Sequence, residues 1–434
     1  MRFISIQEAL DKKRGTVTLR GWVYQLRKLK DKVFIILRDS SNIIQCMINK
    51  KKVSSNVWQS ANKITIESSL QISGSLKQDK RAPNSYELVV NEIDIINIAK
   101  KYPLQVRKQY LSPELLFDYR HLWLRDPKMQ AILKIRSTVF GAIHEYCRSK
   151  GFYEFHSPSI TPGAAETGPT MFKVDYFGKP LYLTQTWQFY AEAGIFSLEK
   201  IYTIAPSFRA ERSKTSRHLA EYWHAEVEAT WYNLDKTIEF AEALVKHVIK
   251  EVLEKNKQEL KFLKRDTKIL EKALNKTWPR IKYDKALRLL KEKKNMAVKW
   301  GKDLRTIEED ELMELFDIPL FITHYPKKIM AFYKPRDPKK PKTALCFDLL
   351  APEGYGELIG GSERDTDIKE LIKSLKAAGE KVENYEFYFD TRRYGSIPHS
   401  GFGLGVERLI SWICHLDNIR DAIPFPRTMQ RYKP

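Results

Sequence analysis

Cysteine is scarce in this sequence, and its placement excludes two common ways of stabilising a fold. Four of the 434 residues are cysteine, at positions Cys46, Cys147, Cys346 and Cys414, and none of them forms a CxxC pair. Such spacing predicts reduced, mostly buried side chains rather than a disulfide framework or a zinc site. No structural metal is expected from the cysteines.

Long hydrophobic runs and repeats are also lacking. No stretch of about 18 apolar residues is present, so no membrane partner is expected. The N-terminus, MRFISIQEALDKKRG, has no apolar run typical of a secretory signal, which favours the cytoplasm. With 43% hydrophobic residues, the chain can form two or three globular domains.

Positive charge, in contrast, is abundant. The formal net charge is +21. Because a basic protein attracts phosphate groups and releases counterions on binding them, this balance favours a nucleotide or nucleic-acid partner.

The stretch from Ile204 to Trp231 predicts a strand, a basic loop and a second strand. The cations that follow the first strand are Arg209, Arg212, Lys214, Arg217 and His218. Such side chains donate charge-assisted hydrogen bonds to phosphate oxygens, although a solvated basic hairpin is the alternative. A second stretch, GFGLGVER from Gly401, predicts a glycine-rich strand that leads into a helix with Arg408 near its start. Together the two stretches favour a site for a nucleoside triphosphate.

Three segments carry a family resemblance. FRAE followed by RH resembles motif 2 of the class II aminoacyl-tRNA synthetases (about 204–231), and GFGLGVER resembles motif 3 (about 401–414). A helical pattern followed by a segment with Pro158 resembles motif 1 (about 129–162). The match is to the aspartyl, asparaginyl and lysyl subgroup and covers nearly the whole chain. It implies an α+β fold, with an N-terminal OB-fold β-barrel and a catalytic domain built on an antiparallel sheet flanked by helices.

The N-terminal region supports this organisation independently. Five short β-type runs lie between Thr16 and Ile96, and a helical piece, Ser54 to Lys63, follows the third, which is the order of an OB-fold. We expect an anticodon-binding barrel at 1–100, a hinge at 101–125 and the catalytic domain at 126–434.

The barrel offers an aromatic and cationic outer face, which suits single-stranded RNA. The resemblance implies that Phe34 stacks on the central anticodon base and that Gln45 contacts the same base. Arg27 is an outward cation beside them. Trp22 is interpreted as a core residue.

Two long helical patterns lie in the catalytic region. From Met129 to Lys150, apolar residues recur at helical spacing, and we expect this face to pack on a second subunit of a homodimer. The pattern from Leu234 to Leu263 is amphipathic and rich in lysine, and we interpret it as a solvated helix.

The resemblance implies ATP as substrate. Arg209 matches the arginine on the α-phosphate and the attacking carboxylate, and Arg408 matches the arginine on the γ-phosphate; these two are the predicted catalytic residues. The remaining predicted ATP contacts are Glu211 and Tyr222 at the adenine, Arg217 and His218 at the outer phosphates, and Glu357. Asp348 and Glu357 resemble the pair that holds Mg²⁺, and Gly360 replaces a serine that some relatives have near this metal.

For the amino acid, Arg364 resembles the arginine that binds the substrate side chain. Glu166 and Gln188 resemble residues that receive its ammonium group. Aspartate-specific relatives have a lysine where this chain has Ala191, followed by Glu192, so we expect the site to offer one cation and one new acid. An acid here repels a substrate carboxylate but accepts a hydrogen bond from an amide, so Glu192 favours asparagine, and tRNA(Asn) as partner.

Three alternatives remain open from the sequence. An aspartate-tRNA ligase is the nearest. An asparagine synthetase on the same catalytic fold is disfavoured by the barrel with Phe34 and Gln45. A non-catalytic RNA-binding relative is disfavoured because Arg209, Arg364 and Arg408 are all present.

Overall fold

The computed structural model describes residues 3–104, 111–162, 171–211, 217–377, 379 and 381–433. It divides the chain into two compact units, Met1–Trp123 and Leu124–Pro434. The division falls inside the predicted hinge, which is not all loop, because α3 (Pro113–Asp118) and α4 (Arg120–Trp123) form there. The domain boundaries themselves stay a prediction.

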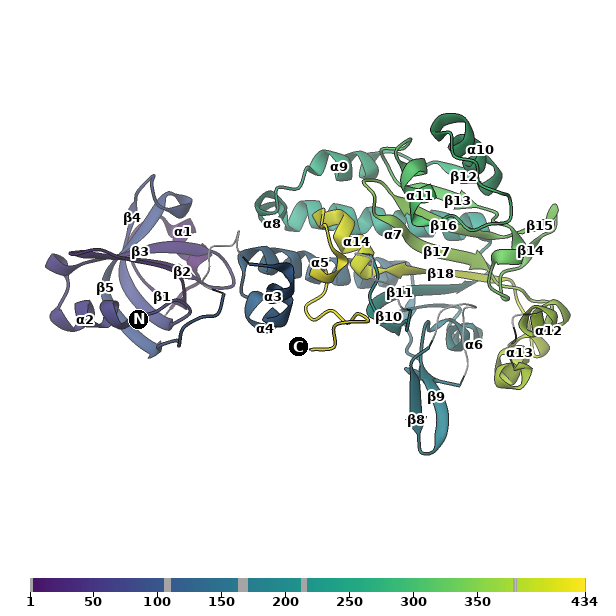
Figure 1. Cartoon of the computed structure of the whole chain (residues 1–434), viewed down its shortest axis with the longest axis horizontal. Helices are drawn as coiled ribbons and strands as arrows, with labels where there is room; N and C mark the ends of the chain where they lie inside the picture. Colours follow the sequence, from purple (N-terminus) through teal and green to yellow (C-terminus); the bar gives the residue numbers. More distant parts are fainter. Residues whose placement is uncertain are drawn as a thin grey trace. The chain divides into compact units, whose positions relative to one another are not determined.

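The first unit contains a closed five-stranded barrel of order β1-β2-β3-β5-β4 (Figure 1). Its elements are α1 (Ile6–Lys12), β1 (Thr16–Lys28), β2 (Lys32–Arg38), β3 (Ile43–Asn49), α2 (Ser55–Lys63), β4 (Ser69–Gln78) and β5 (Tyr86–Asn97). Alternate residues of β2, Val33, Ile35 and Leu37, are fully buried in the barrel core. The helix α2 begins where the Ser54 side chain accepts a hydrogen bond from the Val57 amide. The predicted OB-fold, with its helix after the third strand, is confirmed.

The second unit is built on an eight-stranded sheet of order β12-β13-β16-β17-β18-β11-β10-β6. Its strands are β6 (Tyr153–Glu154), β10 (Lys200–Phe208), β11 (Glu221–Thr230), β12 (Arg280–Lys282), β13 (Leu320–Thr323), β16 (Cys346–Ala351), β17 (Gly356–Glu363) and β18 (His399–Gly405). The pairs from β13 to β10 are antiparallel, whereas the outermost strand at each edge pairs in parallel. The predicted antiparallel sheet is therefore confirmed, with two parallel edges. Smaller strands form separate sheets, namely β7 (Ile160–Thr161), β8 (Lys173–Tyr176) and β9 (Lys179–Leu183) in one and β14 (Arg336–Asp337) and β15 (Lys340–Ala344) in another.

Helices complete this unit. They are α5 (Pro127–Ser149), α6 (Gln188–Leu198), α7 (Leu234–Lys255), α8 (Lys257–Phe262), α9 (Thr267–Asn275), α10 (Tyr283–Lys294), α11 (Thr306–Met313), α12 (Ile368–Ala377), α13 (Glu386–Arg393) and α14 (Val406–Cys414). In Figure 1, α7 runs behind the strands of the sheet, and it contacts β16, β17 and β18.

Two expectations about these helices are wrong. The helix α7 is not a solvated helix: residues such as Ala241, Leu244 and Val248 are fully buried, because its apolar face covers the sheet and α5. The apolar face of α5 is also buried within its own chain, without a second subunit. Ile132 and Ile135 have no exposed surface within the single chain.

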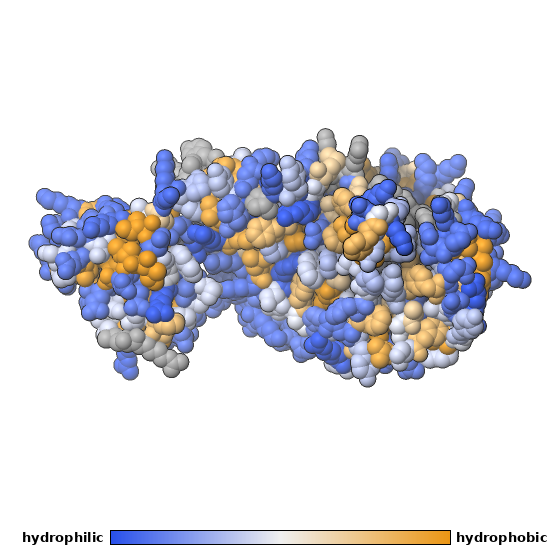
Figure 2. Space-filling model, turned by 90° about the horizontal axis from the view of Figure 1, so that it is seen from below, coloured by the Kyte–Doolittle hydropathy of each residue, from blue (hydrophilic) through white to orange (hydrophobic). Residues whose placement is uncertain are grey.

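On the face drawn in Figure 2, hydrophilic residues predominate and hydrophobic ones are scattered among them, which fits the 30% of charged residues in the sequence. In the described part of the chain, no helix is long and apolar enough to cross a membrane.

Candidate active site and anticodon surface

The predicted anticodon residues lie on three neighbouring strands of the barrel. Arg27 on β1 pairs in register with Phe34 on β2, and Gln45 on β3 pairs with Ile36, two residues along the same face of β2. Phe34 and Gln45 are half-buried and Arg27 is exposed. The Gln45 amide donates to Glu87 Oε2 at 3.1 Å, so a buried acid orients it. The structure therefore places the three predicted residues on adjacent strands.

The prediction for Trp22 is wrong. Its side chain is 43% exposed rather than part of the barrel core. It faces outward because β1 places it opposite Arg38, whose guanidinium lies 5.3 Å from the centre of the Trp22 ring. Arg38 is itself buried and paired with Glu67 at 2.6 Å.

In the second unit, a pocket forms where β11, β17, β18 and α14 meet. Its lining comprises Arg209, Arg217, His218, Leu219, Tyr222, His224, Glu357, Leu358, Gly403, Gly405, Glu407, Arg408 and Ile419. The predicted motif 2 hairpin positions the first six, because β10 and β11 pair in antiparallel register from Lys200 with Ala229 to Phe208 with Glu221. The glycine-rich strand β18 leads into α14, as expected, and brings Arg408 to the same place.

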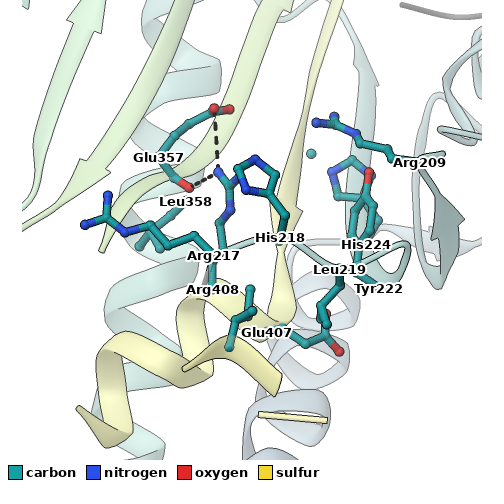
Figure 3. Close-up of a pocket in the computed structure, with 13 residues that line it drawn as sticks. Arg209, Arg217, His218, Leu219, Tyr222, His224, Glu357, Leu358, Glu407 and Arg408 are labelled. Atoms are coloured by element: carbon teal, nitrogen blue, oxygen red, sulfur yellow. Dashed lines mark hydrogen bonds and ion pairs between the residues drawn. The ribbon is translucent and has the colours of Figure 1, made fainter. Parts of the chain in front are cut away.

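The positive side chains of this pocket are half-buried rather than enclosed. In Figure 3, Arg408 extends toward Glu357, and Arg209 and Arg217 lie at opposite sides of the pocket. Arg408 Nη1 donates to the Glu357 carbonyl oxygen at 2.6 Å and lies 3.7 Å from its carboxylate. Arg217 forms two hydrogen bonds with Asp310 on α11, at 3.1 and 2.9 Å. Both arginines are thus oriented by acids at the pocket wall.

The adenine end of the predicted site is also brought together. Glu211 lies with Arg209 and His218 around a smaller adjoining cavity. The Arg209 guanidinium lies 5.6 Å from the centre of the Tyr222 ring. Burial, followed by the charge of Arg408, lowers the pKa of His218 below its usual value, so this histidine is neutral near pH 7.

Acidic side chains gather on the β16 and β17 side of the pocket. Asp348 and Glu357, the predicted magnesium ligands, lie on these paired strands. Burial and the nearby Glu357 carboxylate raise the pKa of Asp348 to about 8. Glu309 on α11 belongs to the same group, and burial together with Glu357 and Asp348 raises its pKa to about 8. The pKa values of these acids rise because they are buried and because their negative charges repel one another.

The glycine noted in this region lies between the two predicted ligands. A Cβ atom at Gly360 would be 3.1 Å from Glu357 Oε1 and 3.6 Å from Asp348 Oδ1. A serine hydroxyl at this position would therefore face both carboxylates. With glycine at this position, no side chain is placed against the two carboxylates from residue 360.

The residues of the predicted amino-acid pocket are buried. Arg364 on the chain just after β17 is 6% exposed, and Glu228 on β11 is 1% exposed. Arg364 Nε and Nη2 donate to the Glu228 carboxylate at 3.0 and 2.8 Å, and Nη1 donates to Ser362 Oγ at 2.8 Å. An arginine has five N–H donors, and the contacts of the described residues use three of those of Arg364. Two N–H donors are therefore left for a further partner.

Glu192 also lies in this pocket and not in solvent, with no exposed surface. Its Oε1 atom accepts from Gln188 Nε2 at 2.7 Å and lies 3.8 Å from Arg364 Nε. Its Oε2 atom is bound by Arg392 Nη2 and lies 3.0 Å from His399 Nε2. The expectation of a single cation here is therefore wrong, because Arg392 is a second one.

Close packing explains part of the glycine pattern of motif 3. A Cβ atom at Gly401 would lie 2.2 Å from Glu228 Oε2 and 2.8 Å from Arg364 Nη2, and one at Gly403 would lie 2.3 Å from His224 Nε2. Only glycine leaves room for these side chains. The glycines of β18 thus admit the polar groups of both pockets.

Sequence reasoning missed several residues of the site. They are Glu228, Glu309, Asp310, Arg392 and His399. Glu228 belongs to the alternating run of β11, which was a usable signal for an inward acid. Arg392 gave none, because it meets Glu192 across 200 positions of sequence. Glu166 lies outside the described residues.

Glu192, Glu228 and His399 are close enough to one another to hold a metal ion. The two arginines that pair with these acids argue against that, since a divalent cation would lie beside two guanidinium groups. We interpret this cluster as part of a pocket for an organic substrate.

The fold and the site together define the class of protein. A basic hairpin, a glycine-rich strand and the acid Glu357 line one pocket on an antiparallel sheet, and the other unit is an OB-fold barrel. Residues 112–429 match the family model for class II tRNA synthetases (D, K and N), and residues 17–96 match that for an OB-fold nucleic-acid-binding domain. The chain belongs to this class II tRNA synthetase family.

Comparison with individual members of this family shows which of them the chain resembles. The chain is 44% identical to the asparagine-tRNA ligase of Thermoplasma acidophilum, over 96% of each protein. It is 45% identical to that of Pyrococcus furiosus, again over 96% of each. The solved asparaginyl-tRNA synthetase of Pyrococcus horikoshii, complexed with asparaginyl-adenylate, superposes with a TM-score of 0.95 at 43% identity over all of both chains. An aspartyl-tRNA synthetase from Entamoeba histolytica gives 0.86 at 25% identity, over 100% of this chain and 93% of that one.

Proposed function

We propose that the protein ligates asparagine to tRNA(Asn), at the expense of ATP, through an asparaginyl-adenylate. The observation that carries the choice of asparagine is a buried cluster in which Arg364 lies between two acids, Glu228 and Glu192. A carboxamide places its oxygen toward the arginine and its NH₂ toward an acid, whereas a carboxylate meets an acid with no proton to donate. A site built for hydrogen bonds rejects the mismatched substrate by several orders of magnitude.

The reaction needs no protein nucleophile. The carboxylate oxygen of asparagine attacks the α-phosphorus of ATP, the bond to the β-phosphate breaks, and pyrophosphate leaves with the electron pair. Arg209 neutralises charge at the α-phosphate and aligns the carboxylate, while Arg217, His218 and Arg408 hold the outer phosphates. Glu211 and Tyr222 hold the adenine.

The residues present fit a magnesium ion. Asp348 and Glu357 supply carboxylate oxygens at one end of the phosphate pocket, and Mg²⁺ prefers one or two protein carboxylates together with phosphates and water. When bound, the ion would neutralise phosphate charge. Glu309 adds a third carboxylate to this group.

In the second step a ribose hydroxyl of the terminal tRNA nucleotide attacks the carbonyl carbon of the adenylate. The bond to the phosphate breaks, and AMP leaves. Selection of the tRNA is assigned to the barrel, where Phe34 stacks on a base and Gln45, oriented by Glu87, hydrogen-bonds to it, with Arg27 at the backbone.

The decisive experiment is amino-acid-dependent exchange of labelled pyrophosphate into ATP, with asparagine and aspartate in parallel. We expect exchange with asparagine at least about 100-fold above that with aspartate. Exchange with aspartate alone would return the chain to the aspartyl type. Formation of asparagine from aspartate and ammonia, without charging of tRNA, would identify an asparagine synthetase instead.

We also propose a homodimer in the cytoplasm, where tRNA and ATP are supplied. With the apolar face of α5 buried in its own chain, the dimer is supported by the resemblance of motif 1 and by the exposed edge strand β6, where Tyr153 is 59% exposed. Light scattering tests it: a mass of one chain, 50.9 kDa, would contradict the dimer.

A further inference from the structure

The buried cluster around Arg364 contains an ion pair that the reaction as described does not use. Arg392 on α13 binds Glu192 on α6, and both guanidinium and carboxylate side chains have no exposed surface. Two ions that are removed from water in this way must hold each other firmly, because an unpaired buried charge is strongly unfavourable.

Arg392 is itself anchored on several sides. Its Nη2 atom donates to the Tyr388 hydroxyl at 2.8 Å, and its Nε atom donates to the Asp365 carbonyl at 3.2 Å. The guanidinium carbon lies 4.0 Å from the centre of the Tyr388 ring. The position of Arg392 is thus set by its surroundings and not by Glu192 alone.

This anchor determines where the carboxylate of Glu192 lies. Arg392 and His399 both act on Oε2, while Oε1 faces Gln188 and stands 3.8 Å from Arg364 Nε. That gap exceeds a hydrogen bond. A carboxylate without a cation behind it would move onto Arg364, the arginine that the substrate side chain needs.

We propose that Arg392 is a positioning residue for asparagine specificity: it holds Glu192 away from Arg364, so that acid and arginine face a neutral carboxamide separately. The inference rests on the proposed function. It predicts that the damage done by removing Arg392 comes from the charge of Glu192, and that neutralising Glu192 relieves it.

The test compares Arg392→Gln, Glu192→Gln and the double variant with the unmodified chain in pyrophosphate exchange. For Arg392→Gln we expect kcat/KM for asparagine to fall about 100-fold, mainly through KM, with KM for ATP within twofold. The double variant should recover at least about tenfold of that loss. Glu192→Gln alone should raise the ratio of aspartate to asparagine exchange about tenfold.

The matched control is Arg393→Gln, next in sequence. Arg393 pairs on the surface with Glu386 and Asp390, and we expect no change in any of these constants. Should Arg392→Gln fail to fold, Arg392→Lys keeps a cation, and asparagine kcat/KM should then stay within about tenfold of the unmodified chain, again with KM for ATP unchanged.

Three results would overturn the proposal: an asparagine KM within twofold of normal in Arg392→Gln, a KM for ATP that rises as much as that for asparagine, or a double variant no better than Arg392→Gln. The last would assign Arg392 to packing. If the unmodified chain shows no asparagine-dependent exchange, the proposed function is wrong. If the unmodified chain exchanges normally but the variants give any of these three overturning results, only the positioning role of Arg392 is wrong.

Discussion

The two pockets of the catalytic unit are built in opposite ways. The phosphate pocket is half-open, and its arginines are half-buried and oriented by acids at the wall. In the amino-acid pocket, Glu192, Glu228, Arg364 and Arg392 are all nine-tenths or more buried.

The difference follows from the ligands. A triphosphate brings several negative charges and its own water and metal, so a half-open pocket with a surplus of cations suits it. The amide side chain of asparagine is uncharged, so the charged side chains around it must already be paired with one another. Asparagine is then distinguished from aspartate because the carboxylate of aspartate would leave buried charges without a partner.

The largest effect in this comparison of the two pockets is expected for Arg209→Ala, which removes a charge from the phosphate pocket. We expect asparagine-dependent exchange to fall about 1000-fold, because charge at the transferring phosphate loses a positioned donor. Arg288→Ala, at an exposed position of α10, is the control and should exchange normally. Retention of more than a tenth of the activity would mean that another residue holds the α-phosphate.

Arg364→Leu tests the buried amino-acid pocket. It leaves the Glu228 carboxylate buried without its partner, so we expect the free energy of unfolding to fall by about 3 kcal/mol, together with loss of asparagine activation. Urea denaturation measures the stability. Arg217→Ala, which breaks a half-exposed pair with Asp310, should cost less than about 1 kcal/mol. Equal losses in the two variants would contradict the contrast between the pockets.

The same Arg217→Ala variant separates the pockets kinetically. Loss of one charge-assisted contact to an outer phosphate should raise KM for ATP about tenfold. KM for asparagine should stay within twofold. A parallel rise in both constants would show that the two pockets do not act independently.

A substitution in the barrel is expected to have the smallest effect on either pocket. Phe34→Ala removes a stacking surface, which should raise KM for tRNA about tenfold while pyrophosphate exchange without tRNA is unchanged. Lys51→Ala, at an exposed barrel position, is the control. An unchanged KM for tRNA in Phe34→Ala would remove this residue from the anticodon surface.

Much of the fold was predictable because its signals are local. The strand runs and the helix after the third strand correctly predicted the barrel, and the hairpin and glycine-rich strand of the catalytic unit were also correct. Errors arose where burial depends on partners distant in sequence. The helix α7 looks solvated by composition but covers the sheet, and Trp22 looks like core but faces out beside Arg38.

The sequence by itself predicted the phosphate-binding residues, because Arg209, Arg217 and His218 belong to one hairpin and Arg408 follows a glycine-rich strand, and each stretch is recognisable from its local pattern. Pairing of β11 with β18 then brings the two stretches together. Only the tertiary structure decided the amino-acid pocket. Glu192, Arg364, Arg392 and His399 come from a helix, a strand end, a second helix and another strand, and Arg392 and His399 lie 200 and 207 positions from Glu192. Charges so far apart in sequence meet only when packing removes them from water, and burial then makes each pairing matter.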